Sequence, residues 1–134
     1  SEMCIRDRLI GIYDSNKQEL LLSSAGHEPP IILSEGGIFT NYTESGPPLG
    51  IMPQIKYKEN IIPFTNSSMY IFTDGITEIK NPKGEMLGSE GFQNYIKQYQ
   101  STANNERLRL MIDEILKKGH VQKDDLTIVV VDSK

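Results

Sequence analysis

The chain has very little cysteine and no long hydrophobic run, and each shortage excludes a class of protein. Cys4 is the single cysteine among 134 residues, so neither an internal disulfide nor a cluster of thiolate metal ligands can form. A chain without disulfides fits a reducing compartment, and we expect the cytoplasm. No apolar stretch approaches the roughly 20 residues that a membrane-spanning helix needs, so we expect no direct insertion into a membrane.

Basic residues are scarce relative to acidic ones. The chain carries 14 Lys and Arg against 18 Asp and Glu, which gives a net charge of −4 at pH 7. Nucleic acids and anionic membranes attract proteins through a basic face, so we expect no nucleic-acid partner. The remaining composition, with 37% hydrophobic residues, is ordinary for a soluble globular protein, and the length suggests one domain.

What the chain does contain is a series of short apolar runs separated by turn-forming residues. These runs predict β-strands over residues 9–13, 19–23, 31–33, 38–40, 57–62, 69–72 and 126–131. Two later stretches repeat apolar residues at helical spacing, through Phe92, Tyr95, Ile96 and Tyr99, and through Leu108, Met111, Ile112 and Ile115. Ser89 is the predicted N-cap of the first helix. Strands, then two helices, then a returning strand indicate an α+β fold in which helices cover a largely antiparallel sheet.

Acidic residues stand next to two of the predicted strands. Asp74 follows the run 69–72, and Gly75 is expected to let the backbone turn there. Asp124 precedes the run 126–131. If the two strands pair antiparallel, both carboxylates fall on one edge of the sheet, where they suit a hard cation such as Mg²⁺ or Mn²⁺. The plainer interpretations are a strand-ending turn at Asp74 and a charged gatekeeper at Asp124; Asp125 replaces Asp124 if the register differs by one residue.

Other polar positions allow two interpretations. His27 could act as a general acid or could hold its Gly- and Pro-rich loop by a hydrogen bond, and we favour the loop. His120 is expected to be a solvated residue after the second helix. The segment Gly46–Gly50 could be a mobile segment that contacts a substrate or has a regulatory role, or it could be an ordered crossover loop.

Five stretches in this order resemble the C-terminal part of the SpoIIE-like branch of PPM-type protein serine/threonine phosphatases. The resemblance runs from about Leu9 to Val131 and is specific through the order and spacing of its motifs. These motifs are Ala25–Pro30, Gly46–Gly50, Phe72–Glu78, Gly84–Gly88 and Gln122–Thr127.

The resemblance implies a PPM-type α-β-β-α sandwich with two divalent cations, Mn²⁺ or Mg²⁺, at one end. It implies hydrolysis of phosphoserine or phosphothreonine on a regulatory protein, typically of the anti-sigma-factor antagonist type, and an upstream sensor or receiver domain. By motif match, Asp74 and Asp124 are the implied metal ligands and thereby the implied catalytic residues.

The N-terminal part of that family's pattern is missing. The family takes further metal ligands from segments in its N-terminal half, including an Asp-Gly pair, and residues 1–8 match none of them. We therefore expect an unmatched leader over residues 1–8 and a partial phosphatase domain over residues 9–134, with weak metal binding and low turnover by itself. A non-catalytic regulatory or partner-binding module with an incomplete metal site is the alternative.

Overall fold

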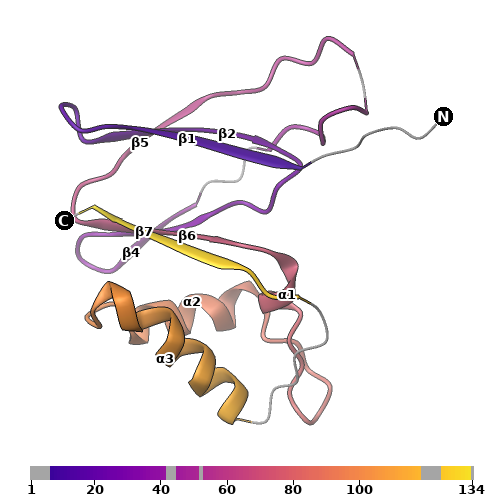
Figure 1. Cartoon of the computed structure of the whole chain (residues 1–134), viewed down its shortest axis with the longest axis vertical. Coiled ribbons are helices and arrows are strands. Elements are labelled where there is room, and N and C mark those ends of the chain that lie inside the picture. The colour runs from indigo at the N-terminus through magenta and orange to yellow at the C-terminus, as the bar shows by residue number, and fades with distance from the viewer. Residues whose placement is uncertain (1–6, 42–44, 52, 119–124, 134) are drawn as a thin grey trace. The chain divides into compact units, whose positions relative to one another are not determined.

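A computed structural model describes residues 7–41, 45–51, 53–118 and 125–133. The chain divides into two compact units (Figure 1). The N-terminal unit comprises residues 1–68 with 133–134, and the C-terminal unit comprises residues 69–132. No helix in the described ranges is long and apolar enough to cross a membrane.

The N-terminal unit is built from antiparallel strands. A three-stranded sheet has the order β1-β2-β5, with β1 at Arg8–Asp14, β2 at Glu19–Ala25 and β5 at Asn60–Pro63. A separate hairpin joins β3, Ile31–Ser34, to β4, Ile38–Asn41. The turn between β1 and β2 forms because the Asp14 carboxylate accepts hydrogen bonds from the backbone amides of Asn16 and Lys17, at 2.9 and 3.2 Å.

The two faces of the β1-β2-β5 sheet are both apolar but differ in burial. Residues alternate between faces along a strand, so Leu20 and Leu22 share one face with Ile62, and all three are at most 8% exposed. The opposite face carries Ile12, Leu21 and Ile61. Leu21 of β2 pairs with Ile12 of β1 on one side and with Ile61 of β5 on the other. Ile12 and Ile61 are 61% and 66% exposed. A sheet with apolar residues on both faces is patterned for burial on both sides.

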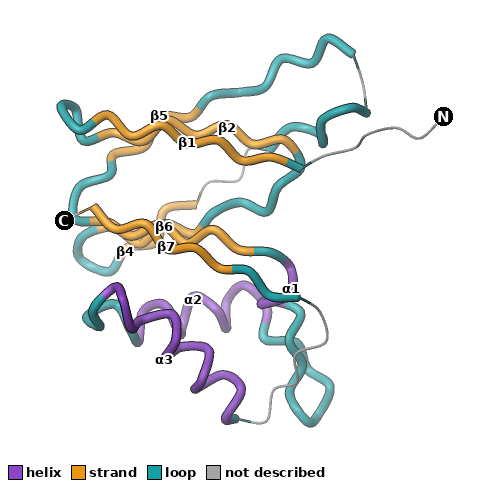
Figure 2. Tube along the Cα trace, in the orientation of Figure 1, coloured by secondary structure: helices purple, strands orange, loops and turns teal. Residues whose placement is uncertain are grey.

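The C-terminal unit packs helices against a pair of strands. It holds most of β6, Ser67–Phe72, then α1, Asp74–Thr77, α2, Gly88–Gln98, α3, Asn104–Lys117, and most of β7, Ile128–Ser133. Strands β6 and β7 are neighbours. They run in opposite directions, since Thr73 at the end of β6 is hydrogen-bonded to Thr127 at the start of β7. Helices α2 and α3 lie on one side of this strand pair (Figure 2).

Aromatic rings and aliphatic side chains fill the core of the C-terminal unit. The Phe92 ring meets the rings of Tyr70 and Phe72 edge-on, with centroid separations of 6.3 and 5.2 Å. Ile96 of α2 and Met111 of α3 are fully buried beside this core. The helical spacing in the sequence therefore identified the packed faces correctly, and the predicted α+β class with antiparallel strands is confirmed.

Several predicted boundaries are wrong. Helix α2 starts at Gly88, so Ser89 lies inside it and makes no cap; the Leu87 amide donates to the Ile79 carbonyl at 2.7 Å, which holds the chain where the helix begins. Strand β5 begins at Asn60 rather than 57, because its pairing with β2 ends there. The expected turn after Thr73 is instead the short helix α1.

Candidate metal centre

Asp74 lies where the sequence predicts it, directly after the buried strand β6. It is the first residue of α1 and its side chain is exposed. Its backbone carbonyl accepts hydrogen bonds from the Glu78 amide at 3.0 Å and from the Thr77 hydroxyl at 3.3 Å. These contacts fix the backbone of Asp74 and leave its carboxylate available, since no hydrogen bond or ion pair joins that carboxylate to another described residue.

Thr73 joins the end of β6, which we call the rim together with Asp74 and Gly75, to the start of β7. Its amide donates to the Thr127 carbonyl at 3.1 Å, and its hydroxyl accepts from the Thr127 amide at 3.3 Å. The Thr127 amide thus bonds to a side chain rather than to a backbone carbonyl, and the regular ladder of β7 starts only at Ile128. The predicted strand start at 126 is therefore wrong by two residues.

Gly75 is required for a different reason from the one that the sequence suggested. Its φ lies outside the left-handed region, unlike that of six other glycines. A Cβ at this position would overlap the carbonyl oxygen of Asp125 and would lie 3.4 Å from the Leu126 Cα. The missing side chain therefore lets residues 125–126 pass directly against α1.

The acidic stretch before β7 is described only from Asp125 onward. Asp125 is exposed, and its backbone packs on Gly75, the neighbour of Asp74. The structure thus brings Asp74 and Asp125 to the same end of the β6–β7 pair. Asp124 and His120 lie outside the described residues, so Asp124 as a metal ligand stays a prediction.

A divalent cation fits the chemistry of this rim, although few ligands gather there. Exposed carboxylate oxygens on a rigid strand end are the donors that Mg²⁺ and Mn²⁺ prefer. However, within the described ranges no group of three or more His, Cys, Asp or Glu side chains could hold a metal ion. Asp74 with one neighbouring aspartate leaves most of an octahedral coordination shell to other ligands.

Two of the sequence motifs are joined to each other in the N-terminal unit. The Gly26 amide donates to the Gly46 carbonyl at 2.7 Å, and the Gly46 amide donates to the Ser24 carbonyl at 2.9 Å. Gly26 has φ +72°, and a Cβ on Gly46 would lie 2.6 Å from the Tyr57 ring. These contacts join the start of the Gly46–Gly50 segment to the loop after β2; whether the segment contacts a substrate stays open.

His27 belongs to the same cluster of loops. Its Nδ1 lies 2.8 Å from the Glu28 carbonyl oxygen, and the Ser24 hydroxyl donates to the His27 carbonyl at 3.3 Å. The hydrogen bond that the sequence predicted for holding this loop is present.

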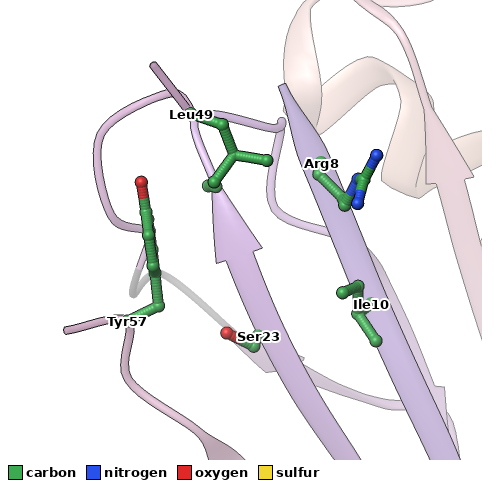
Figure 3. A pocket seen from close by; sticks show the side chains of 6 residues that line it. Arg8, Ile10, Ser23, Leu49 and Tyr57 are labelled. Carbon is green, nitrogen blue, oxygen red and sulfur yellow. The ribbon is translucent and has the colours of Figure 1, made fainter. Parts of the chain in front are cut away.

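A cavity of about 190 Å³ opens beside β1 and β2, and the sequence did not predict it. Figure 3 shows Leu49 and Tyr57 on one side of it and Arg8 and Ile10 on the other. Ile10 pairs with Ser23, so the cavity lies on the exposed apolar face of the β1-β2-β5 sheet. Apart from the Arg8 guanidinium and two hydroxyl groups, its lining is apolar.

Arg107 of α3 is a buried cation that the sequence analysis missed. It is 0% exposed, and it forms an ion pair with Asp132 of β7 at 2.9 Å. Burial by itself lowers the pKa of Arg107, but its hydrogen bond to Asp132 and its interactions with Tyr70 outweigh burial and raise the pKa above the ordinary arginine value. Its position in the sequence could have indicated its burial, because Arg107 precedes the buried Met111 and Ile115 at four-residue spacing.

Comparison with solved structures identifies the fold as that of PP2C-type phosphatase domains. The chain is similar to the SiaA-PP2C domain of Pseudomonas aeruginosa, with a TM-score of 0.79, 18% identity, and coverage of 96% of this chain and 52% of that chain. It is also similar to the Mn-presoaked phosphatase domain of the cell fate determinant SpoIIE from Bacillus subtilis, with a TM-score of 0.69, 21% identity, and coverage of 95% and 56%.

The family follows from the sequence itself. The model of the family described as Stage II sporulation protein E (SpoIIE) matches residues 7–134, so this chain belongs to the SpoIIE family. It is 30% identical over 124 residues to Protein IcfG of Synechocystis sp., covering 90% of this chain and 19% of that protein. It is 29% identical over 125 residues to the Phosphoserine phosphatase RsbU of Bacillus subtilis, covering 91% and 37%. The chain therefore spans well under half the length of these two relatives.

Proposed function

We propose that this chain is part of a metal-dependent protein serine/threonine phosphatase that hydrolyses phosphoserine or phosphothreonine on a regulatory protein. The observation that carries the proposal is the placement of Asp74 at an exposed strand end, beside the residues that lead into β7. Family membership and the similarity to a phosphoserine phosphatase support it.

The residues of the rim have separable roles in this proposal. Asp74 and Asp124 would hold Mn²⁺ or Mg²⁺, and such ions lower the pKa of a bound water and neutralise charge on phosphoryl oxygens. Thr73 and Gly75 keep the Asp74 backbone against residues 125–127. A carboxylate on a fixed backbone holds a ligand position without reorganising, which is what a hydrolytic site requires.

The substrate and surroundings belong to the same proposal. We infer a phosphorylated partner of the anti-sigma-factor antagonist type, an upstream sensor or receiver domain, and a cytoplasmic location. The absence of a basic excess supports a protein substrate over a nucleic acid.

A non-catalytic, partner-binding module remains a second candidate. The small number of acidic groups around Asp74 within the described residues favours it. The exposed carboxylate of Asp74, next to Gly75 and its close approach to the Asp125 backbone, argues against such a module. A module without a metal does not need an exposed carboxylate at this position.

The deciding experiment is Mn²⁺-dependent phosphate release from an aryl phosphate and from phosphoserine and phosphotyrosine peptides. It uses the 134-residue chain and the complete polypeptide, each with Asp74→Asn. We expect activity on phosphoserine in the complete polypeptide and a loss of at least 100-fold in Asp74→Asn. The matched control is Asp113→Asn, an exposed aspartate of α3, which is expected to leave the rate unchanged.

The outcomes separate the two candidates. Activity in Asp74→Asn close to that of the parent removes Asp74 from the site. A folded complete polypeptide that releases no phosphate from any of the three substrates, yet binds a phosphoprotein, favours the binding module.

A further inference from the structure

The apolar pattern of β7 does not by itself define how this strand pairs with β6. Ile128 and Val130 are half-buried, while Val129 and Val131 on the other face are 47% and 42% exposed. Both faces of the strand are therefore β-branched and apolar. A shift by one residue exchanges the two faces. In β7 it would exchange Ile128 and Val130 for Val129 and Val131, which are also β-branched and apolar.

Asp132 is the one charged residue within β7, and both of its carboxylate oxygens are held by α3. Oδ1 accepts from Arg107 Nη1 at 2.9 Å, and Oδ2 accepts from Asn104 Nδ2 at 2.7 Å. The Asp132 side chain is 10% exposed. The strand is thus tied to the first turns of α3 at one defined residue.

Arg107 connects this residue to the rest of the C-terminal unit. Its Nη1 also donates to the Tyr70 hydroxyl on β6 at 3.4 Å, and its Nε and Nη2 donate to the Thr102 carbonyl at 3.1 and 3.0 Å. One guanidinium therefore contacts β6, β7 and the segment before α3. Figure 1 shows α3 running beneath both strands.

The ion pair selects a register more effectively than it adds stability. A buried ion pair is often no better than an apolar pair of similar size, but a buried charge without its partner is strongly unfavourable. A one-residue shift of β7 would place Val131 or Ser133 opposite Arg107. Only the observed register gives the guanidinium a carboxylate.

Register matters at the opposite end of the strand, where β7 meets the candidate metal centre. A one-residue shift moves the strand by about 3.3 Å and turns each side chain to the other face. It would break the paired bonds between Thr73 and Thr127 and would remove the Asp125 backbone from Gly75.

We propose that Arg107 and Asp132 are positioning residues that select the register of β7 and thereby place residues 125–127 against Thr73–Gly75. The register part stands on the contacts of the C-terminal unit alone. Its importance for metal binding rests on the function proposed above.

The test replaces the buried pair by apolar residues in the complete polypeptide, as Arg107→Met with Asp132→Leu. The matched control makes the same substitutions at the exposed pair of the same helix, Arg109→Met with Asp113→Leu, whose side chains are 60% and 65% exposed. The measurement is amide hydrogen exchange at Thr73 and Thr127 by NMR, with the Ile96 amide of α2 as the internal reference for global opening.

We expect the Thr73 and Thr127 amides of the buried-pair variant to exchange at least tenfold faster relative to Ile96, and the control to behave like the parent. Unchanged ratios in a folded buried-pair variant overturn the register proposal. If that variant does not fold, Asp132→Asn, which removes the charge at nearly constant shape, replaces it, and unchanged ratios there overturn the proposal equally.

A second readout separates this inference from the proposed function. Mn²⁺ added to the parent should broaden the amide resonances of Gly75 and Asp125, and the buried-pair variant should need at least tenfold more Mn²⁺ for the same broadening. Equal Mn²⁺ requirements would refute the link between register and metal binding. Absence of broadening in the parent would contradict the metal centre itself, and amide exchange would still decide the register.

Discussion

The two units treat their apolar strands differently. In the C-terminal unit, helices α2 and α3 supply fully buried partners such as Phe92 and Met111 to the strand pair. In the N-terminal unit, the β1-β2-β5 sheet buries Leu22 completely but leaves Ile12 and Ile61 more than half exposed on the other face. The strand pair of the C-terminal unit also has a less covered face, where Val129 and Val131 are 47% and 42% exposed, but the apolar face of the β1-β2-β5 sheet is more open.

The difference teaches that an apolar residue on a strand predicts a face for burial, not a partner that buries it. Stability should follow the partner. Substitutions of covered and of open residues in the two units therefore test whether stability depends on the covering partner. The expected effects range from several kcal/mol for a covered ring to a small pH-dependent change for one phenol.

The largest effect is expected from removing a covered side chain. Phe92→Ala empties a site between the rings of Tyr70 and Phe72 and should lower the free energy of unfolding by about 3–5 kcal/mol. Ile12→Ala on the open face should change it by no more than about 0.5 kcal/mol. Urea denaturation of both variants measures this, and equal losses would show that the open face is covered in solution.

A smaller effect is expected at the close approaches of two glycines. Gly75→Ala places a methyl group against the Asp125 backbone, and Gly46→Ala places one against the Tyr57 ring. Overpacking costs roughly 1–3 kcal/mol; we expect the upper part of this range at Gly75, because a backbone cannot rotate away, and the lower part at Gly46. Thermal unfolding compares the two, and a lower melting temperature for Gly46→Ala than for Gly75→Ala would contradict this ranking.

The smallest effect is expected from one buried phenol. Burial, which outweighs the opposing Arg107 charge, raises the pKa of Tyr70 above its ordinary value. Above about pH 10 the unfolded chain loses this proton while the folded chain keeps it, so stability falls as pH rises and is unaffected below that range.

Tyr70→Phe should therefore reduce the alkaline decline in unfolding free energy, by at most about 1.4 kcal/mol per pH unit for one proton. Tyr13→Phe in the N-terminal unit, where the residue is 44% exposed, serves as the control. Denaturation curves between pH 8 and 11, about the phenol range, give both slopes. The same slope in parent and Tyr70→Phe would show that Tyr70 does not contribute.

The candidate site could be predicted in part from the sequence. The run before Asp74 predicted a buried strand with a carboxylate at its exposed end, and the structure confirms that placement. The reason for Gly75 was predicted wrongly as a turn, because the sequence does not show which backbone will pass beside it. Arg107 was missed because its helical spacing marks a face, while its carboxylate partner comes from a strand far along the chain.

Local patterns by themselves determined most of the elements: alternating and continuous apolar runs set the strands, and helical spacing set α2 and α3, whereas the short helix α1 was not predicted. Tertiary structure alone decided where β7 begins, why residue 75 carries no side chain, and which residue opposes Arg107. These features depend on contacts between residues distant in sequence, such as Thr73 with Thr127 and Tyr70 with Arg107. Periodicity reports how one element is patterned, whereas such contacts exist only once two elements have packed in a single register.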